Sequence, residues 1–434
     1  MINKNNQWLI TVLVSAWILI SQNASATNGY FSIGYGAKMM GMGGVGIAFP
    51  QDTLAGALNP AAMSQVEGVD FGTRVLYASR DSEFDCRGIG ACTEVVSSRS
   101  RRDYFLLPNF GWNKRLNDKN TVGVSVYANG LNTTFRRRLF TETFERVVGA
   151  SPVTTNGHLG ADFAQLNIAA TYTHEFESKH VLGVSPIFSI QKFGASGLDF
   201  FEGLSSDPGS LTDRGDELSY GLGIKFGWFY KPNETYQWGA YYTPRTRMTK
   251  MKKYSGLLAN NGELDIPSNY GIGLAINPNE SFSIALDVSR INYNEIDAFS
   301  NPAPTSAEFT GGFAADRLLG RSEGVGFGWN DITVVKLGMR YIVDDKITLR
   351  LGANYGQEQT PKNAAILNVI TPAVSSKHLT AGFSYKPNQT SEWSFAVMQA
   401  FRNDLTANNT AYLGTDVKTG ISLTAFEISY SMQL

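Results

Sequence analysis

Residues 426–434 read Phe426-Glu-Ile-Ser-Tyr-Ser-Met-Gln-Leu434, and every second residue in this stretch is apolar. Residues 347–355 and the shorter stretch 122–126 alternate in the same way. Successive side chains of a β-strand point to opposite faces, so each of these segments has one apolar and one polar face. Strands that cross a membrane need about 9–11 residues with this pattern. We therefore predict an all-β protein whose strands turn their apolar side to lipid and turn Arg350 and Glu427 inward.

The composition favours membrane strands over a soluble enzyme. Charged residues make up 17% of the 434 residues, below the usual level of about a quarter. The chain contains 44 Gly, 26 Phe and 19 Tyr, which suits strands with one face in lipid. The formal net charge of −1 gives no electrostatic footprint for nucleic acid, so we expect no nucleic-acid partner.

Residues 1–26 have the three parts of a secretory signal peptide. Lys4 supplies a positive start, residues 8–20 form an apolar run of 13 residues, and Ala24 and Ala26 mark a cleavage site. An apolar helix needs about 20 residues to span a bilayer, so the alternative of an uncleaved anchor is disfavoured. The mature chain would begin at Thr27 and hold 408 residues, which is 434 minus 26.

Turn-forming residues divide the rest of the chain into strand-length pieces. Six short polar connections are expected near residues 117–120, 175–179, 232–234, 277–280, 344–345 and 387–389. Seven longer irregular stretches lie between them, at about residues 81–101, 136–159, 194–216, 247–262, 293–330, 359–376 and 404–416. Six turns and seven loops require fourteen strands, and short turns at one end with long loops at the other are typical of an antiparallel transmembrane barrel. A soluble sandwich or propeller is the alternative, but no repeat with blade spacing is present.

Two cysteines, Cys86 and Cys92, are separated by a short segment that contains two glycines. An exported chain passes through an oxidising compartment, so we predict a disulfide between them rather than two free thiols. The four histidines are scattered and none is close to the cysteines in sequence, so we predict no metal site.

Residues 27–64 do not alternate and contain eight glycines. We expect this segment to be a plug inside the barrel formed by residues 65–434, because a barrel of this size would otherwise enclose an open channel. Residues 41–46 match the dinucleotide-binding pattern Gly-x-Gly-x-x-Gly, but no strand precedes them, so the context for that site is missing. We expect no cofactor.

Several segments resemble FadL-type outer-membrane transporters. The likeness covers the whole mature chain, and its densest part is the N-terminal plug. Segments that carry it are Asn28-Gly-Tyr-Phe31, residues 41–48, Gln51-Asp52, Asn59-Pro60-Ala61, Leu107-Pro-Asn-Phe110, residues 123–135 and residues 327–331. The resemblance implies a monomer of the bacterial outer membrane, not an enzyme, that takes up long-chain fatty acids; one branch of the family takes up toluene-like hydrocarbons. One departure is Leu434, where such barrels often have an aromatic residue.

The family mechanism implies specific residues for gating. A hydrophobic ligand would enter from outer loops, bind inside the barrel, and leave sideways into the membrane where the third strand kinks. We expect the kink at Ala128, Asn129 and Gly130, because glycine accepts a bend that β-branched residues cannot take. An ordinary β-bulge is the alternative. The resemblance further implies that the stiff corner Asn59-Pro60-Ala61 packs against this opening.

The outer loops contain apolar clusters that predict a ligand groove. The candidates are Leu198, Phe200, Phe201, Leu204, Leu257, Leu258, Phe309, Phe313, Leu318, Leu319 and Phe327. The alternative is that these side chains pack on one another and cap the barrel.

A fatty-acid carboxylate requires a cation, and Lys192 is the first candidate, followed by Lys336, Arg340 and Arg350. The alternative for each of them is an ordinary charge of the barrel interior. A second set of arginines, at residues 99, 101, 102 and 136–138, lies near the outer loop bases and predicts contact with lipopolysaccharide phosphates. A solvated run of charge is the alternative there.

Two other classes of outer-membrane protein compete with a carrier. A lipase or protease would need Ser, His and an acid to converge, which a sequence does not exclude. A general porin would leave the glycine-rich N-terminal segment without a role.

Overall fold

The computed structural model describes residues 28–101, 103–150 and 157–433. The predicted signal peptide at residues 1–26 lies outside the described residues, as do Arg102 and Leu434. No helix in the described residues is both long and apolar enough to cross a membrane.

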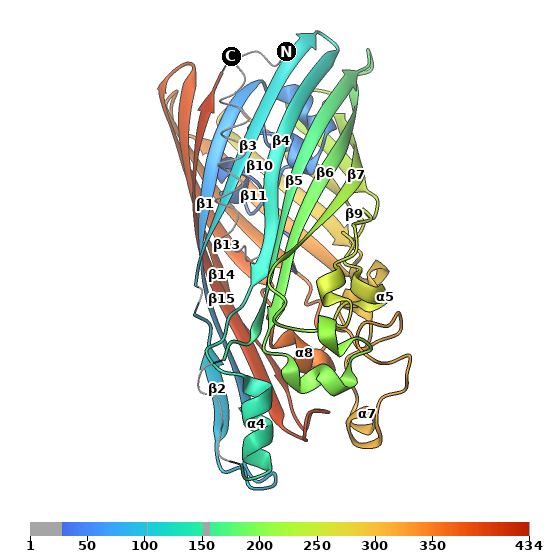
Figure 1. Ribbon diagram of the computed structural model, residues 1–434. Coiled ribbons are helices and arrows are strands. Elements are labelled where there is room, and N and C mark those ends of the chain that lie inside the picture. Colours follow the sequence, from blue (N-terminus) through green and yellow to red (C-terminus); the bar gives the residue numbers. More distant parts are fainter. Residues whose placement is uncertain (1–27, 102, 151–156, 434) are drawn as a thin grey trace, which may run out of the picture.

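The described chain forms one closed antiparallel sheet, in which β1 pairs with β15 (Figure 1). Its strands are β1 (Gly68–Asp85), β2 (Val95–Arg99), β3 (Tyr104–Asn117), β4 (Asn120–Asn132), β5 (Gly160–Glu175), β6 (His180–Ser196), β7 (Glu217–Tyr230), β8 (Tyr236–Thr243), β9 (Asn269–Ile276), β10 (Phe282–Ile291), β11 (Ile332–Ile342), β12 (Ile347–Gly356), β13 (Lys377–Asn388), β14 (Ser391–Ala407) and β15 (Asp416–Met432). Because β2 and β3 pair with successive parts of β1, they form one interrupted strand and the wall has fourteen strands. The predicted fold class is confirmed.

The six short turns gather at one end of the barrel and the seven long loops at the other (Figure 1). All six predicted turns join the expected strand pairs. The first predicted loop, residues 81–101, is wrong in its bounds: β1 continues to Asp85, where it pairs with β2. The alternation weakens there, so the sequence did not reveal this extension beyond the membrane-length part of the strand.

Short helices lie in the N-terminal segment and in the long loops. The N-terminal segment holds α2 (Ala37–Met40), α3 (Ala55–Leu58) and the 3₁₀-helix η2 (Ala61–Gln65). The loops hold α4 (Leu139–Val147), η3 (Asp199–Leu204), η4 (Pro208–Ser210), η5 (Lys252–Tyr254), α5 (Ala259–Gly262), η6 (Tyr293–Glu295), α6 (Asp297–Ser300), α7 (Ser306–Gly311), η7 (Lys362–Ala364) and α8 (Ala365–Asn368).

The two faces of β15 follow the predicted alternation. Phe426 is 58% exposed on the outside of the barrel, whereas Glu427 is 3% exposed. Glu427 meets Arg74 of β1 at 2.7 Å inside the barrel, and Arg350 is buried as well. The polar face of the strands therefore points inward, where each of these charges finds partners away from lipid.

The predicted disulfide between Cys86 and Cys92 is confirmed, with an S–S distance of 2.02 Å. It closes the loop between β1 and β2. The amide of Ala91 in this loop donates a hydrogen bond to the carbonyl oxygen of Val147, so the loop is joined to the end of α4.

Candidate transport pathway

The N-terminal segment, residues 28–65, bonds to strands all around the barrel. Asp287 of β10 accepts the amides of Gly46 and Ile47 at 2.8 and 3.0 Å, and Lys336 of β11 donates to the carbonyl oxygen of Gly44. On the other side, Arg74 of β1 donates to the carbonyl oxygen of Gly34. These contacts join the segment to inward-facing side chains of strands on opposite sides of the sheet, which is consistent with a plug.

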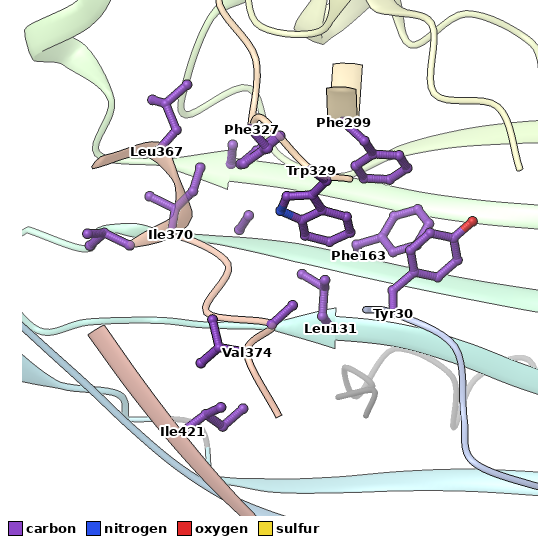
Figure 2. Packing of buried hydrophobic residues seen from close by; sticks show 14 of the residues in the cluster. Tyr30, Leu131, Phe163, Phe299, Phe327, Trp329, Leu367, Ile370, Val374 and Ile421 are labelled. Carbon is purple, nitrogen blue, oxygen red and sulfur yellow. The ribbon is translucent and has the colours of Figure 1, made fainter. Parts of the chain in front are cut away.

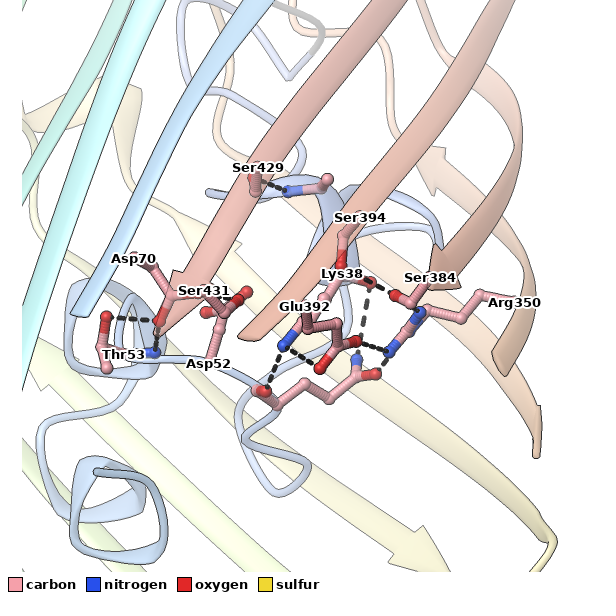
Figure 3. A network of polar contacts seen from close by, with 12 residues as sticks. Lys38, Asp52, Thr53, Asp70, Arg350, Ser384, Glu392, Ser394, Ser429 and Ser431 are labelled. Carbon is pink, nitrogen blue, oxygen red and sulfur yellow. Dashed lines mark hydrogen bonds and ion pairs between the residues drawn. The ribbon is translucent and has the colours of Figure 1, made fainter. Parts of the chain in front are cut away.

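Charged and hydroxyl side chains fasten this segment at the turn end of the barrel (Figure 3). Lys38 forms a salt bridge with Glu392 of β14 at 3.0 Å, and Arg350 of β12 donates to the side chain of Gln51. Asp70 of β1 accepts hydrogen bonds from the amide and hydroxyl of Thr53. The body of the segment is therefore held by charge-assisted bonds, which are stronger than neutral ones.

The first eight described residues, 28–35, contact a different part of the wall, and we call them the tip. The carbonyl oxygen of Tyr30 accepts the amide of Gly130 at 3.0 Å. The side-chain oxygen of Asn129 accepts the amide of Ser32 at 3.1 Å and the hydroxyl of Tyr35 at 2.9 Å. The hydroxyl of Ser32 donates to the carbonyl oxygen of Ala128. The tip therefore bonds to three consecutive residues of β4.

The pairing between β3 and β4 stops beside these residues. Its last pair is Phe110 with Val126, although β4 stays paired with β5 as far as Asn132. A hydrogen bond joins the two sides of the gap again beyond these strands, where the amide of Arg101, before β3, donates to the carbonyl oxygen of Thr134, after β4. Gly130 has φ of 153°, a conformation that L side chains rarely adopt. The wall thus has a stretch without a β3–β4 ladder, and the tip of the N-terminal segment lies against it.

A cavity of about 70 Å³ lies between the tip, α3 and the strands. Its lining includes Asn129 and, on β5, Gln165 and Asn167. Lys225 of β7 also lines it; its amino group donates to the carbonyl oxygen of Ala57 and sits over the rings of Tyr127 and Tyr241 at 5.6 and 5.5 Å.

Several polar atoms of this lining have no hydrogen-bond partner among the described residues. They include the side-chain NH₂ groups of Asn129 and Asn167 and the side-chain oxygen of Gln165. Within the described part of the chain, Lys225 forms no salt bridge. Buried polar groups normally have partners, so the cavity is suited to a ligand with a polar group.

Toward the loop end, the interior is apolar. Tyr30 lies at the inner border of this cluster, with ring centroids of Phe163 and Phe299 at 5.0 and 5.7 Å (Figure 2). Trp329 stacks on Phe299 at 4.8 Å, and the cluster continues through Ile370 to the loops (Figure 2). A hydrophobic ligand entering from the loops would stay among apolar side chains until it reached the tip.

Comparison with known proteins gives the same architecture. A family model described as "Outer membrane protein transport protein (OMPP1/FadL/TodX)" matches residues 19–432. The chain belongs to this family. Its members are outer-membrane transporters of hydrophobic compounds rather than enzymes. In outer-membrane barrels the short turns face the periplasm and the long loops face outward.

Solved structures share the fold at low sequence identity. The toluene transporter TodX of Pseudomonas putida aligns with a TM-score of 0.66 and 18% identity, over 94% of this chain and 100% of that chain. The toluene transporter TbuX of Ralstonia pickettii gives 0.61 and 16%, over 93% and 99%. A FadL homologue of Pseudomonas aeruginosa gives 0.64 and 15%, also over 93% and 99%. No curated protein matched the sequence.

The predicted kink residues lie where the wall is interrupted, but the segment predicted to pack against them, the corner Asn59-Pro60-Ala61, lies elsewhere. Asn59 donates its side-chain NH₂ to the carbonyl oxygens of Ile47 and of Trp228 on β7, at 2.7 and 3.0 Å. Pro60 and Ala61 approach the backbone of Gly183 and Gly227, where a Cβ atom would not fit. The corner therefore packs against β6 and β7, and the tip takes the position at Ala128–Gly130 that the resemblance had assigned to the corner.

Lys192, the predicted carboxylate ligand, is already paired within the protein. Its amino group lies 2.9 Å from Asp162 and 3.3 Å from Asp216 at the outer end of β6. Lys336, Arg340 and Arg350 also bond to protein groups.

Sequence reasoning missed Lys225, whose neighbours in sequence, Ile224 and Phe226, are outward-facing apolar residues. The alternation of this lysine with apolar residues is the signal that could have placed it on the interior face of the strand.

The apolar loop residues divide into two groups. Leu198, Phe201, Leu257, Leu258, Leu319 and Phe327 are buried in the cluster that closes the loop end, and Phe200, Leu204, Phe309, Phe313 and Leu318 are partly exposed. Aromatic rings from four loops form a row, in which Phe144, Phe200, Phe309 and Phe313 are exposed or partly exposed and Tyr412 is buried. Phe200 lies between Phe144 and Tyr412 at 5.6 and 5.2 Å, and Tyr412 is followed by Phe309 and Phe313. A ligand groove stays a prediction for these exposed residues.

Among the described arginines of the predicted lipopolysaccharide site, Arg137 pairs with Glu142 and Arg138 with Asp199. Arg101 and Arg136 are exposed or partly exposed. Arg99 donates to the hydroxyl of Tyr77 and lies 4.0 Å from Asp103. Three of the predicted phosphate ligands are therefore engaged within the protein.

Proposed function

We propose that this transporter takes up long-chain fatty acids and releases them sideways into the membrane between β3 and β4. The observation that carries the lateral route is the contact of the tip with Ala128–Gly130, at the stretch where β3 and β4 are unpaired. A ligand that displaced the tip would reach the wall without crossing bulk water. Returning an alkyl chain to water costs about 0.8 kcal/mol per methylene, so a lateral exit avoids a large barrier.

In this proposal the body of the N-terminal segment stays fixed while the tip moves. The body is held by the Lys38–Glu392 salt bridge and by the bonds to Asp287 and Lys336. The bonds of the tip to β4 are neutral hydrogen bonds, and Arg74 of β1 holds the tip only at its base, at Gly34. Net contributions of neutral hydrogen bonds are about 0.5–1.5 kcal/mol each, so a binding ligand can displace a few of them.

The cavity beside the tip supports a ligand with a carboxylate head. The ammonium group of Lys225 and the NH₂ groups of Asn129 and Asn167 are donors without an acidic partner among the described residues. A carboxylate accepts only, and bonds between charged groups are the stronger kind. The alkyl tail would lie in the apolar cluster of Figure 2.

Binding of oleate and of toluene to the purified protein tests the proposal. We expect oleate to bind, and Lys225→Met to lower its affinity about tenfold or more, the size of one charge-assisted hydrogen bond. Lys192→Met is the matched control, because that lysine already has two carboxylate partners. An unchanged oleate affinity in Lys225→Met would remove the assigned head-group site.

A second candidate is uptake of aromatic hydrocarbons. The row of rings from Phe144 to Phe313 supports it, since aromatic pairs favour edge-to-face contact with a further ring. Two of the similar structures are toluene transporters. Binding of toluene without binding of oleate would favour this candidate, and binding of neither would reject both.

We further propose that the protein acts as a monomer and contacts lipopolysaccharide through the exposed arginines Arg101 and Arg136. The pairing of β1 with β15 closes the sheet, so its first and last strands are not free to pair with a second copy. Mass measurement in detergent tests the first point, and thermal stability with and without added lipopolysaccharide tests the second.

A further inference from the structure

The membrane face of β4 is covered beside the gap. Ala128 pairs with Leu166 of β5, and the flanking pair Asn129 with Gln165 faces the cavity. Alternation therefore directs Ala128 and Leu166 outward. Yet Leu166 is only 7% exposed, whereas the outward apolar residue Leu222 is 80% exposed. Something other than lipid covers this part of the wall.

The cover is Leu107 of β3. Leu107 pairs with Arg74 of β1, whose side chain points into the barrel and bonds to Gly34. Leu107 is thus on the interior face of its own strand, but it packs in one apolar cluster with Ala128 and Leu166. The interior face of β3 consequently lies over the membrane face of β4, and the two strands overlap rather than meeting edge to edge.

Each overlapping strand is firmly held on its far side only. β3 stays paired with β1 from Asn113 to Tyr104, and β4 stays paired with β5 to Asn132. Across the overlap itself, the β3–β4 ladder has ended at Phe110. Separation at this place breaks side-chain contacts and no β3–β4 ladder bond, so the overlap can open without unfolding the sheet.

We propose that Leu107 is the side chain that closes the lateral exit, and that its size sets how readily a ligand passes. The proposal rests on the lateral route given above, and it adds a second barrier after the tip. A ligand that has displaced the tip must still move the Leu107 side chain away from Ala128 before it reaches lipid.

Reversible cross-linking tests this assignment. Leu107→Cys with Ala128→Cys, joined by a short thiol-reactive linker that reductant cleaves, should lower ligand uptake about tenfold or more while ligand binding stays within about twofold, as expected for a gate separate from the binding site. Reductant should restore uptake. The matched control is Phe110→Cys with Val126→Cys, the last paired position of the same two strands. Wild-type protein carried through the same steps accounts for the native disulfide.

A size series gives an independent measurement. Leu107→Ala should speed release of bound ligand and Leu107→Trp should slow it, with folding checked by the heat-dependent shift of the barrel on gels. Uptake that survives the cross-link, together with equal release rates across the series, would overturn the role of Leu107. The double variant Asn129→Val with Gly130→Thr, which straightens β4, then separates two explanations. If this variant blocks uptake, the lateral route is supported and only the role of Leu107 is rejected. If this variant takes up ligand normally, the lateral route is rejected as well.

Discussion

The backbone amide of Gly130 in the barrel wall donates a hydrogen bond to the carbonyl oxygen of Tyr30, 3.0 Å away, in the N-terminal segment. Residues 100 positions apart in sequence are joined where the wall loses its β3–β4 ladder. Because the same segment borders the polar cavity and the apolar cluster, a change at Tyr30 can affect binding and exit together.

Straightening β4 should block uptake. Asn129→Val with Gly130→Thr removes the acceptor for Ser32 and Tyr35 and the glycine with φ of 153°, and it introduces two good strand formers. We expect uptake to fall about tenfold or more in a vesicle uptake assay, with the barrel still folded. Ala170→Val, on the exposed face of β5, is the control and should leave uptake unchanged. Normal uptake in the double variant would contradict lateral exit here.

Loosening the tip should have the opposite effect. Tyr35→Phe removes the hydroxyl that donates to Asn129 at 2.9 Å. One hydrogen bond contributes about 0.5–1.5 kcal/mol, so we expect release of bound ligand to become about 2–10 times faster. Tyr127→Phe is the matched control, since its ring packs on Tyr35 at 4.5 Å and no hydrogen bond of its hydroxyl is seen among the described residues. Equal release rates in the two variants would show that the Tyr35 hydroxyl does not hold the tip.

Glu427→Gln should destabilise the barrel strongly. Arg74 and Glu427 are both buried and lie 2.7 Å apart, and Glu427 also accepts a bond from Asn109. Removing one partner of a buried pair costs about 3–5 kcal/mol, because the other charge is left uncompensated. Urea unfolding in lipid vesicles measures the loss. Glu234→Gln, in the exposed pair with Lys231, should change stability far less, because water screens an exposed ion pair. Similar losses in both variants would contradict the argument.

Asp52 should make stability depend on pH. Burial, followed by repulsion from Asp70, raises the pKa of the Asp52 carboxyl to about 8, while Lys38, the amide of Leu54 and Arg350 act in the opposite direction. Between about pH 4 and pH 8 the folded protein therefore holds a proton that the unfolded chain releases. Unfolding releases that proton, so this residue's contribution makes stability fall as the pH rises through that range.

Asp52→Asn removes this contribution. The variant's urea midpoint should therefore fall less than that of the wild type between pH 5 and pH 8. At pH 8 the variant should be at least as stable as the wild type, since the amide needs no proton to remain neutral. The same pH slope in both proteins would show that Asp52 keeps an ordinary pKa in the barrel.

The order of strands could be predicted because the signals are local. Alternation in segments such as residues 426–434 identifies the lipid face, and polar turn residues such as those at 117–120 mark where each strand reverses. Both signals are contained in fewer than about ten neighbouring residues, so no tertiary information is needed. The disulfide between Cys86 and Cys92 could be predicted for the same reason, since the chain between the two residues is short.

The candidate site could be predicted only in part. Ala128–Gly130 was found because glycine and asparagine interrupt a good strand pattern within three residues. Its partner was assigned wrongly, because the Asn59 corner and the Tyr30 tip both belong to a segment without alternation, so no periodic pattern assigns either of them to a strand. Lys192 was preferred to Lys225 because a sequence does not show that Asp162 and Asp216 occupy one lysine and leave the other facing a cavity.

The sequence by itself determined a fourteen-stranded wall, its inward and outward faces, and the place where one strand departs from regular geometry. Only the tertiary structure decided which N-terminal residues meet that place, which lysine faces the cavity, and that Leu107 lies over Ala128. The physical reason is that alternation and turn chemistry act between neighbours along the chain. Closure of the barrel, in contrast, brings together residues from strands that are far apart in sequence. The register and the curvature of the strands decide which of these residues come into contact.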